Sequence, residues 1–154
     1  MGKSKKYWLL KSEPGVFSID DLQRLGVAHW EGVRNFQARN YLRDELQAGD
    51  GVLIYHSNAK PSGLAGLAEV CKAGHPDHFA FDKKSKYYDP KSKKESPTWY
   101  MVDVRYVGKL KRLISLEEMK AMPELQGMLV IQKGSRLSVQ PVQQHHFEFL
   151  ANQV

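Results

Sequence analysis

The chain has 154 residues, of which 42% are hydrophobic and 26% charged, values typical of one globular domain that can bury a core without disulfides or metal ions. A single cysteine, Cys71, excludes an internal disulfide framework, and no apolar stretch approaches the roughly 18 residues that a membrane-spanning helix needs. The net charge of +6 and the pI of about 9.4 favour an acidic partner.

The first predicted strand covers residues 6–12, where apolar and aromatic side chains run up to a polar end and Pro14. We expect Trp8, inside this strand, to belong to the core. Basic residues precede the strand, but its apolar segment is shorter than a signal peptide requires. We therefore expect the protein in the cytoplasm or the nucleus, and the lack of a long basic extension favours the cytoplasm of a prokaryote.

Two short helices are predicted next. Ser18, with Asp21 three residues later, has the spacing of a capping box and predicts a helix over residues 19–25. Apolar residues at helical spacing predict a second helix over residues 35–46, which Gly49 ends. Both helices lie between predicted strands and are expected to flank a sheet.

The middle of the chain is rich in strand patterns. Residues 51–57 follow a turn signal, and residues 63–73 form a longer segment rich in Gly and Ala. Gly63 and Gly66 would permit this second strand to bend, as in a barrel. Cys71 lies in an apolar part of the same strand, so we expect a packed thiol.

The last third of the chain mixes both kinds of element. Residues 98–107 alternate as a strand, and the capping box of Ser115 and Glu118 predicts a helix over residues 116–122. A short turn is expected near residues 127–131.

A short strand at residues 138–140 is expected to stop at Pro141, and residues 142–150 form a last helix. This order lacks the regular strand–helix alternation of a doubly wound sheet. It predicts an α+β domain with a small, mixed, strongly curved sheet or barrel and peripheral helices.

Most of the positive charge is concentrated in residues 83–94. This segment holds six lysines against one acid, Asp89, and two aromatic residues stand among them. Lysines interleaved with aromatics suit contact with the phosphates and bases of a nucleic acid, although a solvated loop would have the same charge. The candidate contact residues are Lys83, Lys84, Lys86, Tyr87, Tyr88, Lys91, Lys93 and Lys94.

A second group of residues predicts a pocket for a flat ligand. Trp30 precedes a glycine, a cation and an amide, a mixture that stacking and edge recognition of a base require. Strand-end polar residues can converge on the mouth of the same cavity. The candidates for the pocket at these positions are Ser12, Glu13, Asn35, Tyr55, His56 and Ser57, and Arg34 and Arg136 are further candidates for contact with the nucleic-acid backbone. Asn35 has a second interpretation as a helix N-cap.

The sequence shows no catalytic constellation. It contains no phosphate-binding glycine loop and no nucleophile elbow, and its six histidines follow no metal-ligand spacing. His75 and His78 are three residues apart, but Pro76 breaks any helix there. We therefore expect no enzyme activity, no metal and no cofactor. An acid–base enzyme that acts on a nucleotide, with Glu13, Glu31 and His56, remains the alternative.

Taken in order, several segments of the chain resemble the EVE domain, a member of the PUA-like superfamily that is related to the YTH domain. The resemblance extends from about residue 6 to residue 150, inside a single predicted domain of residues 1–154. The shared segments are YWLLKSEP (7–14), WEGVRNFQARN (30–40), GD (49–50), YHS (55–57), GLAG (63–66), YYDP (87–90), WYMVDV (99–104) and GSRLSVQP (134–141).

This resemblance implies a PUA-like mixed β-barrel of about five to six strands with short flanking helices. It also implies a non-catalytic reader that flips a modified base, notably a modified cytosine in DNA or a base in RNA, into an aromatic cage. Trp30 corresponds to the cage aromatic, Ser12, Glu13 and Asn35 to the polar positions, and the lysine-rich segment to a lid. Trp99, in a shared segment, is added to the expected pocket.

The expected partner is therefore DNA or RNA that carries a modified base, bound by a monomer without contact to a membrane. A module that binds a small molecule or nucleotide, or a nucleotide-processing enzyme that uses the same pocket, is the alternative.

Overall fold

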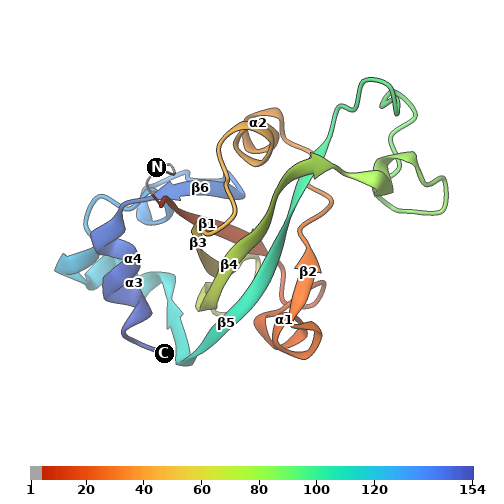
Figure 1. Ribbon diagram of the computed structural model, residues 1–154. Helices are drawn as coiled ribbons and strands as arrows, with labels where there is room; N and C mark the ends of the chain where they lie inside the picture. The colour runs from red at the N-terminus through yellow and green to blue at the C-terminus, as the bar shows by residue number, and fades with distance from the viewer. Residues whose placement is uncertain (1–4) are drawn as a thin grey trace.

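A six-stranded mixed sheet forms the centre of the computed structural model, which describes residues 5–154 (Figure 1). The strand order is β2-β5-β4-β3-β1-β6; β1 and β3 are parallel, and the other neighbouring strands are antiparallel. The strands are β1 (Tyr7–Ser12), β2 (Val27–His29), β3 (Gly51–His56), β4 (Gly63–Pro76), β5 (Tyr100–Ser115) and β6 (Val139–Val142). In Figure 1 the long strands β4 and β5 run side by side across the molecule.

Helices cover both faces of this sheet. The α-helices are α1 (Ile19–Leu25), α2 (Phe36–Asp44), α3 (Leu116–Ala121) and α4 (Gln144–Ala151), and the 3₁₀ helices are η1 (His78–Phe81), η2 (Pro123–Leu125) and η3 (Leu129–Ile131). Side chains of α1 and α2 join one core cluster, and those of α3, α4, η2 and η3 join a second. Strand β1 divides its side chains between them: Trp8 and Leu10 belong to the first cluster, and Leu9 to the second. This alternation follows from the two-residue period of a strand.

The structure confirms the predicted α+β fold with a mixed sheet and short flanking helices. Ser18 and Ser115 form the predicted capping boxes with Asp21 and Glu118, and Trp8 is buried. The register between β4 and β5 shifts next to Gly66, where the sheet was expected to bend. Within residues 5–154, no helix has the length and apolar character needed to cross a bilayer.

Several predicted boundaries were wrong. Strand β5 continues eight residues beyond the predicted end at residue 107, because it pairs with β4 along its whole length. Strand β2 was missed, since its three residues carry too little pattern. Strand β6 does not stop at Pro141, which pairs opposite Trp8 on an edge strand where a missing N–H is tolerated. Cys71 is exposed, so the expectation of a packed thiol is corrected.

Candidate functional site

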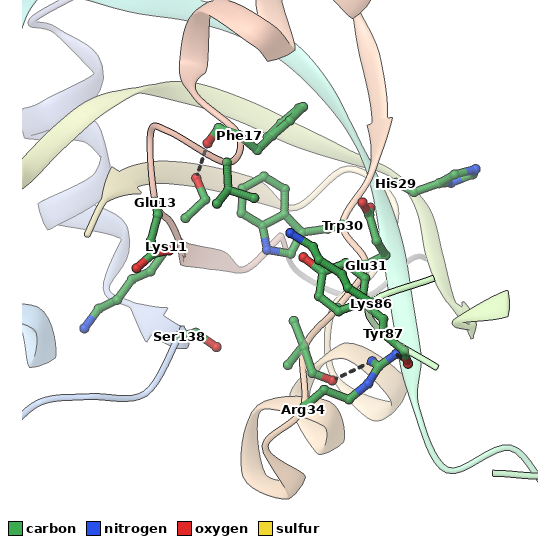
Figure 2. A pocket seen from close by; sticks show the side chains of 14 residues that line it. Lys11, Glu13, Phe17, His29, Trp30, Glu31, Arg34, Lys86, Tyr87 and Ser138 are labelled. Carbon is green, nitrogen blue, oxygen red and sulfur yellow. Dashed lines mark hydrogen bonds between the residues drawn. The ribbon is translucent and has the colours of Figure 1, made fainter. Parts of the chain in front are cut away.

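A cavity of about 480 Å³ opens where the end of β1 meets the segment between β2 and α2 (Figure 2). Its volume lies within the range of roughly 300–1,000 Å³ that small-ligand sites occupy. The lining residues are Lys11, Ser12, Glu13, Val16, Phe17, His29, Trp30, Glu31, Gly32, Val33, Arg34, Lys86, Tyr87 and Ser138. They come from four separate parts of the chain, so only the folded protein forms this site.

Trp30 forms a rigid aromatic wall of the cavity. Its side chain is only 6% exposed and packs with the first core cluster. Its backbone N–H donates to the carbonyl of Val102 at 2.8 Å, which fixes the tryptophan to β5. The ring of Phe17 meets the indole edge-on, with 5.9 Å between ring centroids. Figure 2 shows Trp30 between Phe17 and the pair of Lys86 and Tyr87.

A buried carboxylate holds the segment that follows Trp30. Asp77 is fully buried, and its Oδ2 accepts hydrogen bonds from the Gly32 backbone N–H at 2.9 Å and from Arg34 at 3.0 Å. Its Oδ1 accepts from the Phe79 N–H at 3.0 Å. The other end of the Arg34 guanidinium donates to the carbonyl of Tyr87 at 2.7 Å. Asp77 and Arg34 therefore tie the lysine-rich loop to the wall of the cavity.

Tyr87 covers the backbone beside Trp30. A Cβ atom placed on Gly32 would lie 2.4 Å from Cζ of Tyr87, so the phenol ring packs directly on this glycine. Gly32 also has a φ of +81°, a conformation that side chains disfavour. The Arg34 guanidinium and the Lys86 ammonium both lie over the Tyr87 ring, at 5.5 and 5.1 Å from its centroid.

Polar groups at the cavity are partly occupied by the protein itself. The Ser12 hydroxyl donates to the Phe17 carbonyl at 2.7 Å, and Glu13 accepts from the Asn58 amide at 2.7 Å. Burial raises the pKa of Glu31 above its ordinary value, and the nearby charge of Asp77 adds to this effect. Burial lowers the pKa of Lys11, whose ammonium donates to the Ser135 carbonyl. The cavity thus presents carboxylates and cationic side chains beside an aromatic wall.

Six of the residues predicted for the site meet at this cavity. Ser12, Glu13 and Trp30 were expected in the pocket, and Arg34, Lys86 and Tyr87 were expected at the nucleic-acid backbone or lid; all six line the cavity.

Five residues predicted for the pocket lie outside its lining. Asn35 caps α2, with its Oδ1 accepting from the Ala38 N–H at 2.9 Å. Tyr55 packs in the second core cluster, and His56 accepts a hydrogen bond from the Ile19 N–H at 3.1 Å. The Ser57 N–H donates to the carbonyl of Ser12. Strand alternation turns Tyr55 towards the second core cluster, and helix capping directs the Asn35 side chain to the start of α2.

Trp99 is the fifth of these residues, and it holds the lysine-rich loop instead. Its indole N–H donates to Asp89 at 2.7 Å, and its ring stacks on Phe36 at a centroid distance of 5.0 Å. The Arg34 guanidinium lies 5.2 Å from the same ring.

The remaining candidates for backbone contact are exposed but lie outside the lining of the cavity. These residues are Lys83, Lys84, Tyr88, Lys91, Lys93, Lys94 and Arg136. Figure 1 shows that the loop between η1 and β5, which carries all of them except Arg136, projects from the body of the molecule. Exposed lysines on a projecting loop are free to reach a charged surface.

Sequence reasoning missed other lining residues. Lys11, Phe17 and Ser138 lie next to predicted elements but gave no signal of their own. Glu31 was considered only as an acid for catalysis. His29 was not considered, yet it lies beside His75 and Asp103, the one group of potential metal ligands in the described part of the chain. The sequence analysis considered His75 only together with His78 and rejected that pair as a metal site.

Comparison with known proteins shows the family. Residues 6–153 match the model of the EVE domain. Mouse thymocyte nuclear protein 1 is 44% identical over 163 aligned residues, which cover 94% of this chain and 71% of that protein. A crystal structure from Pseudomonas syringae has a TM-score of 0.89 and 44% identity, and covers 96% of this chain and 99% of that one.

A crystal structure of the human THYN1 protein in complex with DNA that contains 5-methylcytosine has a TM-score of 0.87. It shares 41% identity with this chain, and the alignment covers 96% of both chains. The residues that match the family model include the β1 end, the Trp30 segment and the lysine-rich loop. The chain therefore belongs to the EVE domain family.

Proposed function

We propose that this protein binds DNA that carries a modified cytosine and accepts the flipped base in the cavity beside Trp30. The observation that carries the proposal is the meeting of a rigid aromatic wall, carboxylates and a basic loop at one cavity of suitable size. The related human protein, whose crystal structure contains 5-methylcytosine DNA, supports the choice of nucleic acid and base.

In this proposal, the aromatic wall contacts the face of the base and the carboxylates contact its edge. The exposed part of the Trp30 indole stacks on the base, and base–aromatic stacking contributes about 1–3 kcal/mol. The carboxylates of Glu13 and Glu31 accept hydrogen bonds from the cytosine amino group. Flipping a base out of the stack costs a few kcal/mol, so stacking and hydrogen bonds together are needed to offset it.

Apolar residues of the cavity provide selectivity for the modification. Val16, Phe17 and Val33 line it together with Trp30 and offer contact surface for a methyl group on the base. One buried methyl group contributes about 1 kcal/mol, which corresponds to about a fivefold preference over unmodified cytosine. The polar residues then recognise cytosine, and the apolar residues recognise its modification.

The experiment is fluorescence anisotropy with DNA duplexes of one sequence that differ at a single central base. The bases are cytosine, 5-methylcytosine, 5-hydroxymethylcytosine and N6-methyladenine, and matched RNA forms a further set. We expect tighter binding to one of the modified cytosines in DNA. Trp30→Phe keeps an aromatic core residue while it reduces the stacking surface, so it should reduce this preference.

Tyr87→Ala and Tyr88→Ala form a matched pair within the loop. Tyr87 lines the cavity and packs on Gly32, whereas Tyr88 is exposed and lies outside the lining. We expect the first change to reduce selectivity and the second to preserve it. Equal affinity of the wild type for all bases, or unchanged selectivity in both Trp30→Phe and Tyr87→Ala, would remove this cavity from the proposal.

We also propose that binding leaves the base unchanged. Glu31, with its raised pKa, is the group that favours the alternative of a nucleotide-processing enzyme. Mass spectrometry of the modified oligonucleotide after incubation with the protein separates the two functions. An intact oligonucleotide supports a reader, and a product whose formation is lost in Glu31→Gln establishes the enzyme.

A further inference from the structure

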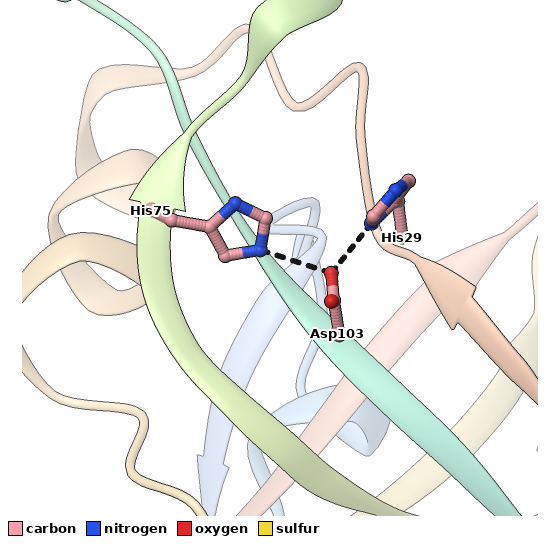
Figure 3. A group of neighbouring side chains, drawn as sticks. All are labelled: His29, His75 and Asp103. Carbon is pink, nitrogen blue, oxygen red and sulfur yellow. Dashed lines mark hydrogen bonds and ion pairs between the residues drawn. The ribbon is translucent and has the colours of Figure 1, made fainter.

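Three side chains from three neighbouring strands meet beside the cavity (Figure 3). His29 ends β2, His75 lies near the end of β4, and Asp103 lies on β5, directly opposite His29 in the strand register. Oδ1 of Asp103 lies 2.6 Å from Nδ1 of His29 and 2.9 Å from Nε2 of His75. One ligand atom from each residue lies within 4.8 Å of the other two.

The surroundings of the three residues resemble those of a half-open ion site. The side chains of Asp103 and His75 are mostly buried, at 13% and 17% exposure, whereas His29 is 47% exposed. The Asp103 carboxylate therefore lies between two imidazoles, with one side accessible from solvent.

We propose that His29, His75 and Asp103 bind a divalent transition-metal ion of the zinc class. Two imidazole nitrogens and one carboxylate oxygen form a ligand set that suits Zn²⁺ and leaves a coordination position for water or another ligand. Ligands at 2.0–2.1 Å from a tetrahedral ion lie roughly 3.3 Å apart, so small side-chain rotations would bring these three atoms into place.

Binding changes the protonation of the imidazoles. In the hydrogen-bonded cluster, His29 Nδ1 and His75 Nε2 face the carboxylate, and each coordinates an ion only without its proton. Each proton moves to the other nitrogen of its ring or is released to solvent. The exposed His78, whose ring centroid lies 5.4 Å from that of His29, is the nearest further imidazole.

The ion would connect β2, β4 and β5 directly before Trp30. His29 itself lines the cavity, so the metal site would share one residue with the candidate base site. Metal binding at this cluster is independent of the proposed DNA binding and can be measured without nucleic acid.

The test is titration of Zn²⁺ by calorimetry and of Co²⁺ by visible absorption, on protein without a histidine tag. Cys71 is replaced by serine throughout, because its exposed thiol is itself a zinc ligand. We expect one equivalent of each metal to bind and the melting temperature to rise with Zn²⁺. His75→Gln and Asp103→Asn should each weaken binding at least tenfold, and His145→Gln, an exposed histidine on α4, should not.

His29→Gln keeps the test decisive if the more buried variants fail to fold, because its side chain is about half exposed. It should also weaken binding at least tenfold while circular dichroism stays unchanged. Absence of saturable binding at one equivalent, or an equal loss in His145→Gln, would reduce the cluster to a hydrogen-bonded clamp between strands and overturn the proposal.

Discussion

At the scale of single residues, the candidate site depends on a few positions that cannot be exchanged freely. Asp77 is fully buried and serves the backbone of Gly32, the guanidinium of Arg34 and the backbone of Phe79 at once. Buried polar groups are costly when a partner is lost, so each of these contacts constrains the others. The segment that follows Trp30 is thus held by a network around Asp77.

Gly32→Ala tests how closely Tyr87 packs on this wall. The new Cβ would meet Cζ of Tyr87 at 2.4 Å, and the backbone φ of +81° adds strain. We expect a loss of about 1–3 kcal/mol in the free energy of unfolding, measured by urea denaturation. We also expect weaker preference for the modified base, because Tyr87 has to move.

Substitutions at two other glycines separate the effect of the clash with Tyr87 from the effect of the positive φ. Gly134 has a similar φ of +78° and Gly15 has no positive φ, and a Cβ on either would meet nothing within 4 Å. The expected order of destabilisation is therefore Gly32→Ala, then Gly134→Ala, then Gly15→Ala. A Gly32→Ala protein as stable as Gly134→Ala would show that Tyr87 moves aside at no cost.

At the scale of elements, much of the fold could be predicted from local patterns. The capping residues Ser18 and Ser115 set the starts of two helices, because hydroxyl caps satisfy free N–H groups whatever packs around them. Strand lengths could not be predicted in this way. The second half of β5 pairs with β4, a contact between residues far apart in sequence that no local pattern records.

Like the fold, the candidate site could be predicted only in part from local sequence patterns. Trp30 and Arg34 share one short segment whose mixed composition marks it as a site. His56 and Trp99 have the residue types of a pocket, but tertiary contacts use them elsewhere. His56 accepts from the first turn of α1, and Trp99 donates to Asp89. Residue type therefore identified candidates, and only the fold distinguished positions that line the cavity from structural ones.

The contact between His56 and α1 predicts a pH dependence of stability. His56 Nε2 accepts the Ile19 N–H at 3.1 Å, which requires the unprotonated nitrogen. Burial lowers the pKa of His56 below 6.5, with smaller effects from Asp20 and Lys109. Because the unfolded chain then binds more protons than the folded one, stability is lost as the pH falls below about 6.5 towards the folded-state pKa.

Urea denaturation at pH 7.5 and at several values down to pH 5 measures this loss, which for one group cannot exceed about 1.4 kcal/mol per pH unit. His56→Gln can still accept the Ile19 N–H through its amide oxygen but does not titrate. We expect it to show a smaller pH dependence than the wild type. Identical slopes for His56→Gln and the wild type would assign the effect to other groups, such as His146.

At the scale of the whole molecule, the net positive charge is concentrated on one loop. The segment of residues 83–94 contributes five of the six net positive charges, while the rest of the chain is nearly neutral. This segment lies in the loop that projects beyond one end of the β4–β5 pair, and α3 and α4 lie towards the other end (Figure 1). A localised charge of this kind orients a polyanion towards the cavity rather than attracting it to every face.

Removal of the charges of Lys91, Lys93 and Lys94 tests whether the loop contributes to affinity for DNA without contributing to base selectivity. Their replacement by glutamine should weaken binding to modified and unmodified duplexes by the same factor, because phosphates carry no base information. Each lost phosphate contact should also reduce the slope of log affinity against log salt by about one. Anisotropy titrations at three or more salt concentrations measure both effects.

The matched control removes the same charge from exposed positions outside the loop, with Lys111, Lys120 and Lys133 replaced by glutamine. If the loop acts as a directed contact, this control should keep nearly the full salt slope, since charges beyond a Debye length of about 10 Å are screened at 0.1 M salt. Equal losses in the two triple variants would mean that net charge alone attracts the DNA. The lysine-rich loop would then contribute to encounter but not to placement of the base beside Trp30.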